Sequence, residues 1–163
     1  MVDDKCQAMA SPALPKESLD RSFRLDDMIR TTAAMTPDDS KLLLGGSLLT
    51  VGNSSDDSAA KIAALVQVDL SSDEVEFKRD FDFATSVEAI APLPQKTVLL
   101  TANRHSGEMA YFLVVLDSQG SDVAVPALVH QSKQDSYVST EGQGASLLFD
   151  QSANHVIVSI ALG

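Results

Sequence analysis

Short apolar runs, separated by clusters of Asp, Ser, Gly and Pro, dominate the hydrophobic pattern of this chain. In EVEFKRDFDF (residues 74–83) the apolar Val75, Phe77 and, after a slip, Phe81 and Phe83 stand between charged residues. This alternation is typical of a strand with one face in water. The other runs of strand length cover residues 41–51, 61–70, 86–94, 96–104, 109–117, 122–130, 144–152 and 154–163. The pattern predicts an all-β fold of many short strands. Pro126 places the run at 122–130 at an edge of its sheet, because proline cannot donate to a ladder.

The best candidate for a helix is SLDRSFRLDDMIRTTAAM, residues 18–35. Ser18 and Arg21 do not form a capping box, and Thr31 and Thr32 weaken the helical run. We therefore favour two strands, one in RSFRLD and one in MIRTTAAM, and keep a partly helical segment as the alternative. Residues 1–17 show no sustained period and predict a flexible tail.

The strand order occurs more than once along the chain. LVQVDLSSDEV and FLVVLDSQGSDV are near-echoes, with Asp69 and Asp117 48 residues apart (117 − 69). Pro37 and Pro92, which stand near the starts of two such units, are 55 residues apart (92 − 37), and Asp150 follows 58 residues later (150 − 92). The first unit carries a longer connection, SLLTVGNSSDDSAAK (residues 47–61), where the second has only ANRHSGEM (residues 102–109), and this difference explains the shorter spacing of the echoes. Unequal loops on a constant strand order are typical of repeat architectures.

Each full unit contains four strands in about 55 residues, and such units are typical of propeller blades. The predicted fold is an incomplete β-propeller of about two and a half four-stranded antiparallel blades, with a small β-sandwich or β-roll as the alternative. Residues 18–163 form this region. Residues 18–30 would supply the last strand of a preceding blade, and the blades span residues 31–83, 86–130 and, in part, 144–163.

Two segments carry a resemblance to a known family. AAMTPDDSKLLLGGS resembles the first two strands of a WD-repeat blade, and LVQVDLSSDEVEF resembles the third and fourth, with Val68-Asp69-Leu70 in the place of Trp-Asp-Leu. The resemblance extends over roughly residues 20–163. The chain departs from the pattern because it has no tryptophan and no Gly-His dipeptide before the first strand. The resemblance implies a propeller that acts as a platform for other proteins.

Closed propellers have four to eight blades, which is more than this chain supplies. We expect either that the chain is a fragment of a longer one or that a partner, or self-association, covers its open sheets. The apolar run VIVSIALG at the open end is an association hazard.

Charge and cysteine content narrow the classes of partner. Twelve Lys and Arg against 23 Asp and Glu give a net charge of −11, which disfavours nucleic acid and anionic membranes. Cys6 is the single cysteine, so an intramolecular disulfide is excluded. The N-terminus has no apolar signal-peptide core, and no run reaches the length of a membrane span. We expect a cytoplasmic protein.

No residue is predicted to be catalytic, to hold a cofactor or to bind a metal, since no Gly-x-Ser-x-Gly, phosphate-loop or metal-ligand spacing occurs. The predicted contact for a partner with a basic surface is the acidic loop Asn53, Ser54, Ser55, Asp56 and Asp57. Ser54, Ser55, Ser71 and Ser72 precede acidic residues, the pattern an acidophilic kinase favours. Asp69 and Asp117 are interpreted as residues that brace their own turns.

These observations predict a non-enzymatic protein–protein interaction scaffold built from propeller blades. The alternative is a fragment of a propeller enzyme, of lactonase or hydrolase type, with its site in a central channel.

Overall fold

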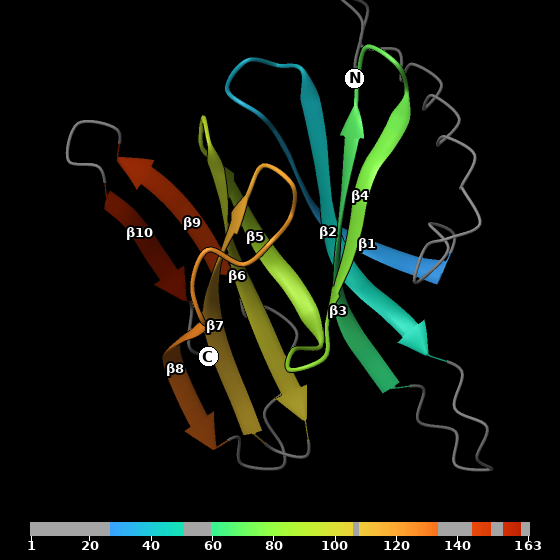
Figure 1. The fold of residues 1–163 in the computed structure, drawn as a ribbon. Helices are drawn as coiled ribbons and strands as arrows, with labels where there is room; N and C mark the ends of the chain where they lie inside the picture. The colour runs from blue at the N-terminus through green and yellow to red at the C-terminus, as the bar shows by residue number, and fades with distance from the viewer. Residues whose placement is uncertain (1–26, 51–59, 106–107, 134–144, 151–154, 161–163) are drawn as a thin grey trace, which may run out of the picture.

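The computed structural model describes residues 27–50, 60–105, 108–133, 145–150 and 155–160. This part of the chain forms three antiparallel sheets of four, four and two strands, which Figure 1 shows packed beside one another. The strands are β1 (Met28–Met35), β2 (Lys41–Thr50), β3 (Ala60–Asp69), β4 (Glu74–Phe81), β5 (Ser86–Pro92), β6 (Lys96–His105), β7 (Glu108–Asp117), β8 (Ala127–Lys133), β9 (Ala145–Asp150) and β10 (His155–Ile160).

The first sheet is a meander in the order β1-β2-β3-β4. Its β1 shows that MIRTTAAM is a strand rather than part of a helix, while RSFRLD lies outside the described residues. The hairpin β2–β3 pairs along its whole length, from Lys41 opposite Asp69 to Thr50 opposite Ala60. The segment between Thr50 and Ala60 is the longer connection expected from the repeat spacing.

The second sheet, β5-β6-β7-β8, repeats the first closely. Lys96 lies opposite Asp117 as Lys41 lies opposite Asp69. The first strand of each sheet carries a register shift at the same place, around Thr31 in β1 and around Glu88 in β5. When the two sheets are superposed by their strand registers, Pro92 is equivalent to Met35 and not to Pro37. The reason is that the β5–β6 turn is shorter than the β1–β2 turn.

The last strand of the second sheet begins later than the sequence echo indicates. Asp122 forms an isolated bridge with Leu116, but the ladder then breaks and β8 starts only at Ala127, directly after Pro126. Because proline has no N–H to donate, the ladder resumes beyond it. The outer position of β8 agrees with the edge placement inferred from Pro126.

The two four-stranded sheets meet along an apolar seam. β5 packs against β1, β2 and β3 of the first sheet. The Thr31 hydroxyl donates to the carbonyl of Val87 over 2.9 Å, and Arg79 on β4 donates to the Gly120 carbonyl and pairs with Asp122 beyond β7. The buried side chains of this seam are Leu43, Ala63, Leu65, Phe81, Ala84, Val87, Leu99, Val114 and Leu116.

The two-stranded sheet β9–β10 covers the other face of the second sheet. Its alternating pattern turns Leu147, Val156 and Val158 inward and leaves Leu148 and Ile157 exposed. The inward side chains pack on buried residues of β5, β6 and β7. Because β9 contacts β5 and β6, it packs against the second sheet at the place equivalent to that of β5 on the first sheet.

The predicted all-β fold, with two complete four-stranded antiparallel units and one partial unit, is confirmed. The array is open rather than closed.

Candidate functional site

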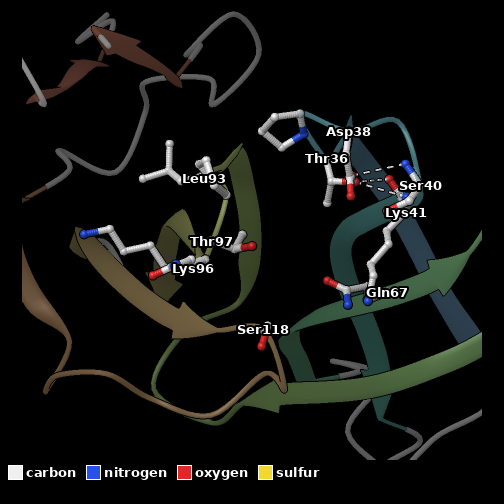
Figure 2. Close-up of a pocket in the computed structure, with 12 residues that line it drawn as sticks. Thr36, Asp38, Ser40, Lys41, Gln67, Leu93, Lys96, Thr97 and Ser118 are labelled. Carbon is white, nitrogen blue, oxygen red and sulfur yellow. Dashed lines mark hydrogen bonds between the residues drawn. The ribbon is translucent and has the colours of Figure 1, made fainter. Parts of the chain in front are cut away.

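A cavity of about 340 Å³ opens where the first two sheets meet at their turns (Figure 2). One wall is the β1–β2 turn with the start of β2, and the other is the β5–β6 turn with the start of β6. Because these turns are equivalent in the two repeats, the cavity, here called the inter-sheet cleft, follows from stacking one repeat on the next. Its lining residues are Thr36, Pro37, Asp38, Ser40, Lys41, Gln67, Leu93, Pro94, Gln95, Lys96, Thr97 and Ser118.

The first wall is held by hydrogen bonds within its own turn. The Thr36 hydroxyl donates to Asp38 Oδ1 over 2.6 Å, and the Ser40 amide donates to the same oxygen over 3.2 Å. Asp39 takes a left-handed conformation, with φ of 56°. The bond from the Thr36 hydroxyl, followed by bonds from Ser40, lowers the pKa of Asp38 to about 2. Asp38 is therefore an exposed, ionised and positioned carboxylate at the mouth of the cleft.

Behind this turn, a polar network joins three strands. Lys41 Nζ lies 2.7 Å from Glu76 Oε1 and 2.8 Å from Oε2. The side-chain amide of the buried Gln67 donates to the same carboxylate over 2.5 Å. Because Glu76 compensates Lys41, this lysine adds little net charge to the cleft.

The second wall is more apolar. Leu93 is buried, and its amide donates to the carbonyl of Lys96 over 2.8 Å, which closes a tight turn carrying Pro94 and Gln95. Within the described residues Lys96 forms no ion pair. Ser118 reaches the cleft from the turn after β7.

Asp69 and Asp117 lie in the neighbouring turns at the same end of the sheets. Asp69 Oδ1 accepts bonds from the Ser71 hydroxyl (2.6 Å), the Ser71 amide (2.8 Å) and the Ser72 amide (3.0 Å). The Ser71 hydroxyl is the largest of the causes that lower the pKa of Asp69. Asp117 Oδ1 accepts from the amides of Gln119 and Ser121, both over 2.9 Å. Each carboxylate thus ties down the turn that follows its strand.

Acidic side chains concentrate at this end of the first sheet. The amide of Leu70 donates to the carbonyl of Ser40 over 2.9 Å, so the β3–β4 turn lies beside the β1–β2 turn. Together these turns and the strand ends next to them carry Asp38, Asp39, Asp69, Asp73, Glu74 and Glu76. The end of the first sheet that borders the cleft is therefore strongly negative.

The predicted contact loop, Asn53, Ser54, Ser55, Asp56 and Asp57, lies outside the described residues. The strand ends that flank it, Thr50 and Ala60, are at the opposite end of the sheet from the cleft. Ser71 and Ser72 lie in the exposed β3–β4 turn.

Sequence reasoning missed the inter-sheet cleft. The signal that could have found it is the pair of proline-containing turns, TPDDSK and PLPQK, at equivalent places in two repeats. In the sequence, each of these turns is interpreted only as a connection between two strands. The cleft forms because the fold brings the two turns together.

In comparisons with known proteins, no protein-family model, no curated protein and no solved structure matches the chain. Among the described residues, no group of three or more His, Cys, Asp or Glu side chains is placed to hold a metal ion. The same residues include no helix with the length and apolar character needed to cross a membrane.

Proposed function

We propose that this chain is a non-enzymatic protein–protein interaction scaffold that binds a basic segment of a partner at the inter-sheet cleft. The observation that carries the proposal is the cleft itself, formed by equivalent turns of two stacked repeats and bordered by acidic residues. A volume of about 340 Å³ falls at the lower end of the range for ligand pockets, which suits a few side chains of a peptide.

The lining matches such a segment in chemistry. Asp38 offers a fixed negative charge to a lysine or arginine of the partner, and charge-assisted hydrogen bonds are the stronger kind. Pro37, Pro94 and Leu93 supply apolar surface for the adjoining residues. Gln67 and Thr97 place polar groups at the walls, where a peptide backbone would find hydrogen-bond partners.

The wider setting of this function is also a proposal. The four-stranded sheets are taken as blades of a propeller resembling WD-repeat proteins, and the cytoplasm is the location that a scaffold of this kind implies. The acidic segment Asn53–Asp57 is proposed as a second contact for a basic surface.

The test uses a library of random seven-residue peptides selected on the folded protein. Enriched peptides should be rich in Lys and Arg, and their affinity should fall as salt rises, because exposed charges are screened. Asp38→Asn should weaken binding by about three- to tenfold, whereas Lys96→Glu should strengthen it. Asp82→Asn is the matched control, since Asp82 is an exposed acid in the β4–β5 connection at the far end of the sheet.

Enrichment of acidic or uncharged peptides would contradict the proposal. So would equal losses of affinity from Asp38→Asn and Asp82→Asn, because the effect would then reflect net charge and not the cleft.

A further inference from the structure

The first sheet has an apolar cluster on its outer face, the face turned away from the second sheet. In β3, Ala63 and Leu65 belong to the seam between the two sheets. Ala64 and Val66 alternate with them along the strand and therefore point to the opposite face. The members of this outer-face cluster are Met28, Leu44, Leu48, Ala64, Val66, Val68 and Val75, with the partly buried Leu42 beside them. All of them belong to β1–β4, so no described strand of the other two sheets takes part in the cluster.

The outer-face cluster is shielded from water although no described strand of another sheet contributes to it. Ala64 and Val66 are both 0% exposed, and Val68 is 5% exposed. Leu148 and Ile157, which point outward from the β9–β10 sheet, are instead 64% and 50% exposed. A sheet face that meets only water leaves its side chains exposed in this way, because neighbours within the sheet cover only their flanks. Another part of the chain therefore lies over the outer-face cluster.

Chain connectivity identifies the residues upstream of β1 as that part. Residues 51–59 begin and end at one end of the β2–β3 hairpin, so they extend at most about 17 Å from it. Val68 lies eight residues along β3 from Ala60 (68 − 60), or about 26 Å, which is out of their reach. The stretches outside the described residues beyond residue 105 join or follow strands of the second and third sheets, on the other side of the first sheet (Figure 1). In contrast, the residues before Asp27 lead directly into Met28, a member of the outer-face cluster.

The second sheet shows how the equivalent face is covered in the next repeat. Val114 and Leu116 of β7 correspond to two valines of the outer-face cluster when the aspartates that end β3 and β7 are aligned. Both pack in the seam with Phe81, the last residue of β4. Phe83, in the connection to β5, meets Phe112 of β7 edge to face, with the ring centroids 5.4 Å apart. The residues directly before the first strand of the second sheet thus cover this face, and the residues directly before β1 hold the equivalent place in the first repeat.

We propose that residues 18–26, SLDRSFRLD, dock on the outer-face cluster. Their apolar side chains, Leu19, Phe23 and Leu25, are the ones available to pack on it, and burial of such side chains is the main favourable term in docking. Because the segment is joined to Met28, docking is intramolecular and occurs at a high effective concentration. The segment takes the surface on which another sheet would stack, as the second sheet stacks on the first. It is therefore an internal cap, and its release would open a sheet-stacking surface.

The test measures the accessibility of a single thiol in the full chain, with Cys6→Ser removing the natural one. Ala64→Cys and Ala63→Cys form a matched pair, because both parent residues are 0% exposed, adjacent on β3 and on opposite faces. Leu148→Cys is the exposed reference. In the parent chain, both β3 thiols should react with a soluble disulfide reagent at least about a hundredfold more slowly than the reference.

Substitutions in the segment should release one face only. Phe23→Ser combined with Leu25→Ser should speed the labelling of Ala64→Cys by at least about tenfold and leave Ala63→Cys protected. Leu14→Ser is the matched control, since Leu14 is an apolar residue upstream of the proposed segment, and it should change neither rate.

Four outcomes would overturn the proposal. The first is rapid labelling of Ala64→Cys in the parent chain, and the second is protection that survives the change of Phe23 and Leu25. A third is equal exposure of both β3 thiols in that variant, because the segment would then hold the whole fold and not one face. The fourth is protection that rises with protein concentration together with a dimer seen by light scattering, because a second copy would then be the cover.

Discussion

The glycine pair in β2 gives the most direct test of how the first two sheets are packed. Gly45 and Gly46 lie inside the strand, not in a turn, at the point where β1 and β5 approach it. A Cβ on Gly46 would lie 1.9 Å from the carbonyl oxygen of Ile29 and 2.9 Å from its carbonyl carbon. Both atoms belong to the backbone of β1, so no change of rotamer can relieve the contact.

Gly46→Ala must therefore move the part of β1 next to its register shift by roughly 1 Å. This movement breaks several ladder hydrogen bonds, at about 1 kcal/mol each, and also loses packing contacts. We expect the free energy of unfolding to fall by about 3–5 kcal/mol, a large part of the 5–15 kcal/mol typical of a domain. In Gly45→Ala the new Cβ meets side chains instead, Val87 Cγ1 at 2.8 Å and Thr32 Cγ2 at 2.9 Å. A loss of about 1–3 kcal/mol is expected there.

Urea unfolding followed by circular dichroism measures these losses as shifts of the midpoint at constant slope. Val87→Ala removes the methyl group that Gly45→Ala strikes. The double variant should consequently be more stable than the sum of the single losses by about 1 kcal/mol or more. Additive losses, or a Gly46→Ala protein that unfolds within about 0.5 kcal/mol of the parent, would refute this description of the seam.

Three further predictions concern the core, the cleft and two equivalent leucines. Tyr111 is fully buried, and within the described structure its hydroxyl has no hydrogen-bond partner, so Tyr111→Phe should raise the free energy of unfolding by about 1 kcal/mol in the same urea assay. The lowered pKa of Asp38 means that its ionised form stabilises the fold above pH 3.8, and that this contribution disappears as the pH falls to about 2. In the Asp38→Asn variant, the free energy of unfolding should therefore depend less on pH between 3.8 and about 2, as measured by acid unfolding. Leu65→Ala should lower the free energy of unfolding by about 3 kcal/mol, and Leu113→Ala, at the equivalent but half-buried position, should lower it by less than half as much. Equal losses of stability would contradict the smaller burial of Leu113.

Local pattern was sufficient to predict the strands and their grouping into repeated units. Alternation in EVEFKRDFDF and the apolar runs around it predict strands because side chains in a strand point to opposite faces in turn. The bonds of Asp69 and Asp117 are likewise local, since each carboxylate reaches amides only two to four residues ahead. The two-strand interpretation of residues 18–35 is supported for β1, where propensity already disfavoured a helix.

What the sequence by itself determined is thus the all-β class, the four-stranded repeat and the turns that carry acidic residues. Tertiary structure decided how one repeat meets the next: the cleft between equivalent turns, the contact that requires glycine at Gly46, and the packing of the two-stranded sheet on the second sheet. Strand pattern depends on residues close together in the chain, whereas each of these features joins segments from different strands or sheets. Their geometry is set by packing between surfaces, which no single stretch of sequence contains.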